Sequence, residues 1–134
     1  MTLVDSSVWI DYFRGVESIT TERLDNLLDR ERVVSGDLII AEVLQGFTID
    51  REFQRARRVL LALKIVDIAG TEIAVEAAMN YRRLREKGVT VRKTIDTLIA
   101  TRCLWDDLEL LYSDKDFDGF VQHLGLRRAQ PPIS

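Results

Sequence analysis

Short apolar runs that alternate with helical patterns constrain the fold of this chain more than any other feature. Four runs with strand character lie at about residues 2–5, 32–35, 65–68 and 109–112. In the stretches between them, hydrophobic residues recur every three or four positions, which is the spacing of an amphipathic helix. Strands that are separated by helices favour a parallel sheet covered on both faces. The sequence therefore predicts an α/β fold with a central parallel sheet.

The helical patterns are expected at about residues 6–14, 20–30, 38–46, 50–63, 71–87, 94–106 and 117–124. The pattern that starts at Thr71 has the clearest end signals. Basic residues fill its last turns, where they complement the helix dipole, and Gly88 follows as a stop. We expect Asp50 and Thr71 to act as N-caps, because short polar side chains accept hydrogen bonds from the free backbone N–H groups of a first turn.

The chain has 134 residues, and 46% of them are hydrophobic, which is enough for one domain with a sizeable core. We expect this domain to span residues 1–128 and to be followed by a tail at 129–134, where two prolines oppose regular structure. No apolar run approaches the roughly 18 residues of a membrane span. The N-terminus lacks the basic segment of a signal peptide, and the single cysteine, Cys103, permits no internal disulfide. These features predict a cytoplasmic protein without a membrane anchor.

The formal net charge of −3 argues against a generic nucleic-acid coat, whose binding depends on excess Lys and Arg. It does not argue against an enzyme that acts on nucleic acid, because such an enzyme can combine an acidic metal pocket with local basic flanks. The distribution of charge is therefore more informative than the total.

Four acidic residues lie where a parallel fold would gather them. Asp5 and Asp114 each end an apolar run, Asp96 falls in the first turn of a predicted helix, and Glu42 lies inside an apolar stretch. Ligands of open parallel sheets bind beyond the carboxyl ends of the strands. Buried carboxylates are costly unless they share a proton or a cation. Hard oxygen ligands suit Mg²⁺ or Mn²⁺, so the pattern indicates hydrolysis of a phosphodiester. Ordinary helix-capping or solvent-facing acids remain the alternative.

Four segments resemble the motifs of one family. They are Leu3–Trp9 (LVDSSVW), Ala41–Val43 (AEV), Lys93–Ala100 (KTIDTLIA) and Leu111–Phe117 (LYSDKDF). In this order and at these separations they are similar to PIN-domain ribonucleases, especially the VapC-type toxins of type II toxin–antitoxin pairs. The resemblance implies a PIN-like three-layer α/β/α fold and a Mg²⁺-dependent endoribonuclease, with Mn²⁺ as a possible substitute. It also implies products with a 3′-hydroxyl and a 5′-phosphate, a homodimer, and a VapB-like antitoxin that silences the toxin in a higher assembly.

The resemblance also implies roles for individual residues. Asp5 and Asp96 correspond to the principal metal ligands, and Glu42 and Asp114 complete the acidic cluster, so that these four are the expected catalytic residues. Asp116 can replace or assist Asp114, and this alternative stays open.

Three further residues are expected around the metal ligands. Ser7 resembles a small residue that forms hydrogen bonds in the family's pocket. Arg92 and Lys93 precede Asp96 by three to four residues, so they are candidates to hold an RNA phosphate beside the ion.

Other readings of these residues are less consistent with the sequence. The segment Asp114–Gly119 matches the first half of a calcium EF-hand loop, but the twelfth position, which needs a bidentate Glu, is Gly125. A phosphoaspartate hydrolase would need another acid two residues after Asp5, where this chain has Ser7. The competing class is a non-catalytic acidic α/β binding module with a structural or vestigial metal site. Finally, the apolar faces Leu24–Leu28 and Phe53–Leu63 are candidate docking surfaces for an antitoxin helix.

Overall fold

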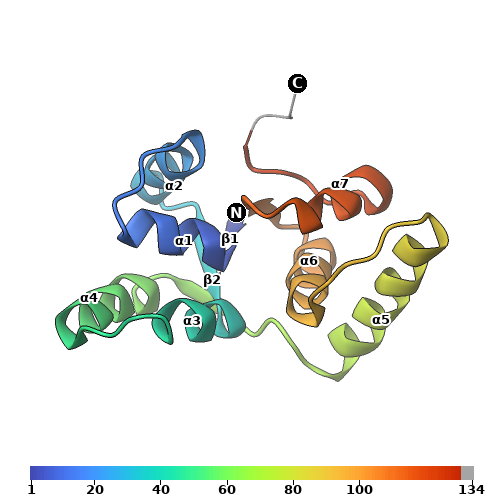
Figure 1. The fold of residues 1–134 in the computed structure, drawn as a ribbon, viewed down its shortest axis with the longest axis horizontal. Coiled ribbons are helices and arrows are strands. Elements are labelled where there is room, and N and C mark those ends of the chain that lie inside the picture. Colours follow the sequence, from blue (N-terminus) through green and yellow to red (C-terminus); the bar gives the residue numbers. More distant parts are fainter. Residues whose placement is uncertain (131–134) are drawn as a thin grey trace.

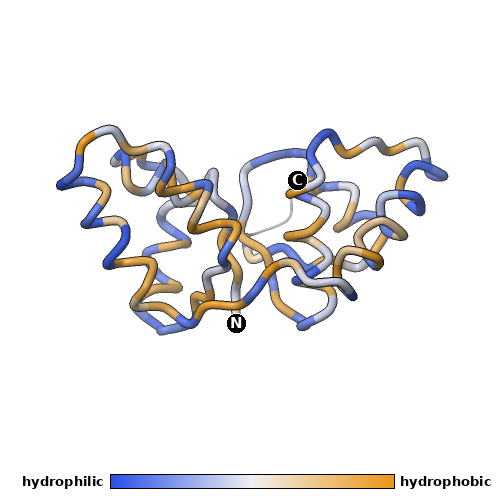
Figure 2. Tube along the Cα trace, turned by 90° about the horizontal axis from the view of Figure 1, so that it is seen from below, coloured by the Kyte–Doolittle hydropathy of each residue, from blue (hydrophilic) through white to orange (hydrophobic). Residues whose placement is uncertain are grey.

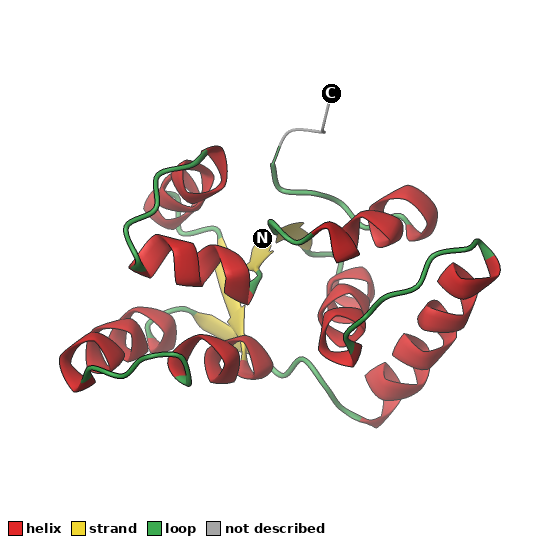
Figure 3. Cartoon of the chain, in the orientation of Figure 1, coloured by secondary structure: helices red, strands yellow, loops and turns green. Residues whose placement is uncertain are grey.

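In the computed structural model, which describes residues 1–130, a small sheet separates two groups of helices (Figures 1 and 3). The strands are β1 (Thr2–Val4), β2 (Val33–Gly36), β3 (Lys64–Val66) and β4 (Glu109–Leu111). The helices are α1 (Ser6–Phe13), α2 (Ile19–Asp29), α3 (Asp37–Leu44), α4 (Asp50–Leu61), α5 (Thr71–Glu86), α6 (Thr94–Asp106), the 3₁₀ helix η1 (Lys115–Phe117) and α7 (Asp118–Leu124). Helices α1–α4 lie on one side of the sheet and α5–α7 on the other (Figure 1). The predicted three-layer α/β/α architecture is confirmed.

The four strands are all parallel and lie in the order β3-β2-β1-β4. From β1 the chain moves outward to β2 and then to β3, and it crosses back to place β4 on the other side of β1. The direction of winding therefore reverses between β1 and β4. In doubly wound sheets this reversal leaves a crevice outside the carboxyl ends of the two strands, where ligands bind. Asp5 and Asp114, which follow these two strands, are thereby brought to one place.

The core consists of the strands and the inner faces of the helices. Leu3 and Val4 of β1 and Leu110 and Leu111 of β4 have no exposed surface. The tube in Figure 2 alternates between hydrophobic and hydrophilic residues along the helices, as expected for helices with one buried face. Trp9 is completely buried and stacks on Phe13.

Two predicted N-caps were wrong. Asp50 and Thr71 are the first residues of α4 and α5, and the cap positions are taken by Ile49 and Gly70, neither of which offers a capping side chain. Gly70 has a φ of +135°, which side chains with a Cβ rarely adopt. With Gly70 at the cap position, α5 starts at Thr71, one residue earlier than it would with Thr71 as the cap.

The edge strand also ends earlier than expected, because β3 stops at Val66. The backbone N–H of Ile68 donates to the Asp37 carboxylate (2.8 Å) instead of to a neighbouring strand, and the Ile68 side chain is fully buried. The chain therefore turns away from the sheet at Asp67 to begin its crossing toward α5.

The two expected docking faces are mostly core. Leu24 and Leu60 are completely buried and Leu27 is 5% exposed, so their side chains are covered within this chain. The prediction that these faces offer apolar docking surfaces was wrong for these side chains, because helical spacing alone does not distinguish a core face from an interface.

The start of the expected tail lies against the sheet. Ala129 is buried, and its N–H donates to the Leu110 carbonyl (3.0 Å) beside β4. The Gln130 side chain donates to the Tyr112 carbonyl. Residues 131–134 lie outside the described part of the chain. Among residues 1–130, no helix is both long enough and apolar enough to cross a membrane.

Candidate metal centre

Asp5 is held at the carboxyl end of β1. Its backbone N–H donates to the Leu111 carbonyl (2.9 Å), which ties the end of β1 to β4. Its side chain caps α1 and accepts hydrogen bonds from the Ser7 hydroxyl (2.6 Å) and the Ser7 N–H (3.3 Å). Burial raises the pKa of Asp5, the hydrogen bonds from Ser7 and Ser6 lower it, and the nearby charge of Asp114 raises it. Asp5 is thus a buried carboxylate with a second carboxylate in reach.

Asp96 enters the same place from the first turn of α6, as predicted. It is 5% exposed, and its Oδ2 atom is buried without a hydrogen-bond partner among residues 1–130. Burial, followed by the charges of Asp5 and Asp114, raises the pKa of Asp96 to about 7, with Glu42 adding to the effect and Lys93 opposing it. A carboxylate in this position is unfavourable unless a proton or a cation compensates it.

Asp114 and Asp116 complete a close group of oxygens after β4. Asp114 accepts a hydrogen bond from the Asp116 N–H (2.9 Å) and so caps the 3₁₀ helix η1. One carboxylate oxygen from each of Asp96, Asp114 and Asp116 lies within 4.8 Å of the other two. These oxygens are close enough to bind a common ion. Asp114 and Asp116, the two alternatives for the fourth acidic residue, can therefore both take part in the site.

Glu42 borders this group from α3. Its Oε1 accepts a hydrogen bond from the Ser6 hydroxyl (3.0 Å). Burial raises its pKa, the Ser6 hydrogen bond lowers it, the charge of Asp5 raises it, and Lys93 lowers it. Glu42 is half-buried, so it lies at the rim of the site and not in the core. The charges of Asp5 and Glu42 reach Asp96, since both raise its pKa, but among residues 1–130 the oxygens that lie within 4.8 Å of one another come from Asp96, Asp114 and Asp116. Asp5, expected as a principal ligand, and Glu42 therefore lie outside this closest set.

The donor set fits a hard divalent cation. It consists of carboxylate oxygens, which Mg²⁺ and Mn²⁺ accept, and it contains no His or Cys. The unpartnered Oδ2 of Asp96 is a second indication of a ligand site, separate from the clustering of the acids, because buried polar atoms in folded proteins normally have a partner. A cation among Asp96, Asp114 and Asp116 would satisfy this oxygen and relieve the mutual repulsion of the acids.

The basic residues and the serines are placed less simply than the sequence indicated. Arg92 donates from Nε to Asp116 Oδ2 (3.2 Å), so its guanidinium already contacts the acidic group. Lys93 is exposed, and its charge lowers the pKa of both Asp96 and Glu42. The Ser7 hydroxyl donates a hydrogen bond to Asp5, which is itself a candidate metal ligand.

Two contacts of the site were missed by sequence reasoning. The Ser6–Glu42 hydrogen bond joins residues 36 positions apart, and the Arg92–Asp116 pair joins residues 24 apart. Neither pair has a local sequence signal. Ser6 stands next to Asp5, which is the one hint that it faces the same crevice.

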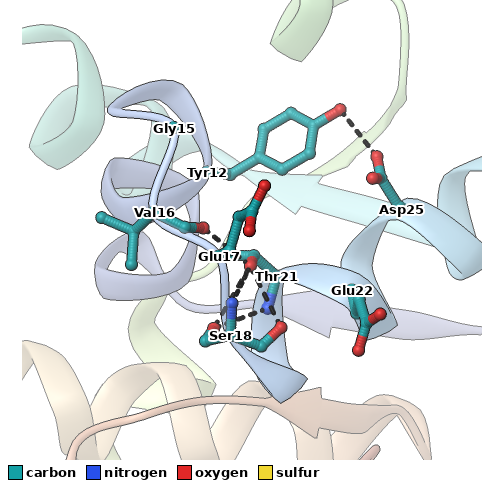
Figure 4. A pocket seen from close by; sticks show the side chains of 8 residues that line it. All are labelled: Tyr12, Gly15, Val16, Glu17, Ser18, Thr21, Glu22 and Asp25. Atoms are coloured by element: carbon teal, nitrogen blue, oxygen red, sulfur yellow. Dashed lines mark hydrogen bonds between the residues drawn. The ribbon is translucent and has the colours of Figure 1, made fainter.

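A separate cavity of about 580 Å³ lies between α1 and α2 and also has acidic residues in its lining (Figure 4). It is lined by Tyr12, Gly15, Val16, Glu17, Ser18, Thr21, Glu22 and Asp25. Glu17, Glu22 and Asp25 are all exposed to solvent, and the Tyr12 hydroxyl donates to Asp25 (3.0 Å). This cavity is therefore lined by exposed acids, and the buried acids Asp5 and Asp96 are not part of its lining.

Comparisons with known proteins show which family this chain is similar to. The model of the PIN domain family matches residues 2–120. A VapC ribonuclease of Mycobacterium bovis is 30% identical over 131 residues, which are 96% of this chain and 98% of that protein. Ribonuclease VapC11 of Mycobacterium tuberculosis matches with the same identity and coverage.

Two solved structures share the fold. A toxin–antitoxin complex from Klebsiella pneumoniae has a TM-score of 0.71 at 19% identity and covers 98% of this chain and 100% of its own. VapBC2 from Rickettsia felis, bound to a DNA fragment from the promoter, has a TM-score of 0.72 at 16% identity and covers 95% of this chain and 96% of its own.

Proposed function

This chain belongs to the PIN-domain family and to its VapC-type members, and on that premise we propose that it is a Mg²⁺-dependent endoribonuclease that acts as the toxin of a toxin–antitoxin pair. The observation that supports this proposal most directly is the buried, unpartnered Oδ2 of Asp96, which belongs to a group of three carboxylates with oxygens within 4.8 Å of one another. The names of the relatives support RNA as the substrate.

In the proposed site, oxygens of Asp96, Asp114 and Asp116 would hold the metal, and Asp5 and Glu42 would complete the acidic surroundings directly or through water. When bound, the ion supplies a lower pKa for the attacking water and neutralises charge that grows on the phosphate. The catalytic residues of the proposal are Asp5, Glu42, Asp96 and Asp114.

The other residues of the site position these acids. Ser7 fixes the orientation of Asp5, and Ser6 does the same for Glu42. Hydrogen bonds of this kind hold ligands in the geometry that the metal requires. Arg92 and Lys93 are the proposed contacts for a backbone phosphate, because cationic side chains that flank a metal site neutralise the substrate without reading its sequence.

The proposal is tested by incubating a mixed RNA pool with the purified protein in Mg²⁺, in Mn²⁺ and in excess chelator. We expect cleavage only with a divalent ion, and losses of roughly 100-fold or more in Asp5→Asn and Asp96→Asn. Asp25→Asn is the matched control, since Asp25 is an exposed acid of the cavity in Figure 4. Sequencing of the new ends is expected to find 3′-hydroxyl and 5′-phosphate groups.

Two results would contradict the proposal. Cleavage that survives both substitutions would place the activity elsewhere or in a contaminant. Tight metal binding without cleavage of any RNA would favour the non-catalytic binding module instead.

The partners of the proposal are a VapB-like antitoxin and a second copy of this chain. The solved structures that share the fold are described as toxin–antitoxin assemblies, which supports the antitoxin. Light scattering after size-exclusion chromatography would measure the mass of the chain alone and after co-expression with a VapB-like protein. We expect a dimer alone and a larger complex that no longer cleaves RNA. A monomer that does not bind the VapB-like protein would contradict the proposed partners.

A further inference from the structure

Arg92 is the residue of this site whose contact is not explained by substrate binding alone. It lies in the segment between α5 and α6, and its side chain is 73% exposed, whereas that of its partner Asp116 is 16% exposed. The guanidinium uses Nε for this contact, at 3.2 Å from Asp116 Oδ2, and its two terminal nitrogens make no hydrogen bond to residues 1–130. The Arg92 guanidinium therefore forms an ion pair with one of the three carboxylates that would hold a metal.

We propose that Arg92 is an exchangeable counter-ion of the metal site. It pairs with Asp116 when no metal is bound, yields that carboxylate when a divalent ion binds, and then offers its guanidinium to a phosphate of the RNA. This inference rests on the proposed function, and it assigns to Arg92 a regulatory effect on metal affinity that a phosphate-binding role does not include.

The energetics favour an exchange over a permanent bond. An ion pair with a largely exposed arginine is weak, because water and salt screen it and a long side chain must be ordered. A divalent ion among three carboxylates interacts with twice the charge in a less exposed place. Asp116 is thus expected to favour the metal over Arg92, and the repulsion between Arg92 and the ion lowers the metal affinity of the wild-type protein.

The two terminal nitrogens of Arg92 make no hydrogen bond to residues 1–130, so they can bind a phosphate once the side chain leaves Asp116. A guanidinium can bind phosphate oxygens through two parallel hydrogen bonds, and Arg92 already lies beside the acids that would hold the ion. Lys93 differs, because its charge acts on Asp96 and Glu42 while it forms no ion pair within residues 1–130. We therefore expect exchange at Arg92 and simple electrostatic attraction at Lys93.

The experiment measures the dissociation constant for Mn²⁺ and the KM for RNA. The proposal predicts that removal of the Arg92 charge lowers the first and raises the second. Isothermal titration of Mn²⁺ into the metal-free protein, without RNA, is expected to give a dissociation constant roughly three- to tenfold lower for Arg92→Gln than for wild type. The KM for cleavage of a fluorescent single-stranded RNA is expected to rise several-fold in the same variant. Arg92→Lys keeps the charge, so its Mn²⁺ affinity is expected to stay near that of wild type.

Arg127→Gln is the matched control. Arg127 forms an exposed ion pair with Asp107 (2.9 Å), so its substitution makes the same change in net charge without touching the acidic group. Its Mn²⁺ affinity and its KM are expected to match wild type. If Arg92→Gln binds Mn²⁺ no more tightly than wild type, or if Arg127→Gln shifts it equally, the exchange is contradicted while the nuclease proposal stands. If wild type fails to bind Mn²⁺ at all, both are contradicted.

Discussion

Two acidic regions within residues 1–130 differ in how far their carboxylates are buried. At the crevice between β1 and β4, Asp5 and Asp96 are 3% and 5% exposed, and burial, followed by the charges of neighbouring acids, raises the pKa of both. Around the cavity between α1 and α2, Glu17, Glu22 and Asp25 are exposed (Figure 4). The acids of the first region are largely buried, and those of the second are exposed to solvent.

This difference separates a ligand site from a hydrated surface. An exposed carboxylate is already stabilised by water and needs no cation, whereas a buried carboxylate without a donor is unfavourable. In the cavity region, the polar groups serve the local structure. Ser18 and Thr21 cap α2 reciprocally, and the Thr21 hydroxyl donates to the Val16 carbonyl (2.8 Å). At the crevice, Asp96 Oδ2 has no such partner among residues 1–130. Burial and the lack of a donor, more than the number of acids, make the crevice the candidate metal site.

The largest effect that would test this comparison is stabilisation by metal. A ligand that binds only the folded state adds about 2.7 kcal/mol of stability at a concentration 100 times its dissociation constant. We expect Mn²⁺ to raise the melting temperature of the wild-type protein and of Asp25→Asn equally, and to leave that of Asp96→Asn unchanged. Thermal unfolding with and without chelator measures this. A loss of the effect in Asp25→Asn would show that the exposed region also binds the ion.

The next effect is the stability of the metal-free protein as a function of pH. The pKa of Asp96 is about 7 in the folded state and near 3.8 as a free side chain, so the folded state binds the proton more tightly. The stability contributed by this residue is therefore present below about pH 4 and is lost as pH rises toward 7. Asp96→Asn, which cannot ionise, is expected to be more stable than wild type at pH 8 by about 1–3 kcal/mol.

Chemical denaturation in chelator at pH 4.5 and pH 8 measures this difference. The advantage of Asp96→Asn is expected to shrink at the lower pH. Asp25→Asn serves as the control and is expected to change stability by less than about 0.5 kcal/mol at either pH. A variant of Asp96 that is less stable than wild type at pH 8 would indicate a structural role for this carboxylate.

The same contrast explains which parts of the molecule the sequence could predict. Asp5 directly follows β1 and Asp114 lies three residues after the end of β4, and the apolar runs of the sequence indicate both strand ends, which the parallel topology then brings to one edge of the sheet. Asp96 was placed because α6 begins at Thr94, as the helical pattern predicted. These are local signals combined with one topological rule.

What the sequence could not predict depends on distances between segments and on backbone conformation. The Ser6–Glu42 and Arg92–Asp116 contacts require helices and loops that only the folded chain brings together. The start of α5 depends on the positive φ of Gly70, which a capping rule for Thr71 does not detect. The edge strand β3 ends at Val66 because Asp37, on a different element, accepts the Ile68 N–H.

The smallest effects come from a pair of serines, one in each acidic region. Ser7 donates its hydroxyl to Asp5 (2.6 Å), and Ser18 accepts the Thr21 N–H (3.1 Å) as the N-cap of α2. Ser18→Ala removes a cap and is expected to cost about 1 kcal/mol of stability while cleavage stays within twofold. Ser7→Ala is expected to lower metal affinity or cleavage roughly tenfold, because the orientation of a ligand carboxylate is lost. Denaturation and cleavage assays on both variants give a two-by-two comparison. If Ser18→Ala reduced cleavage as much as Ser7→Ala, orientation of Asp5 could not explain the loss, and the two acidic regions would have to be coupled through α1.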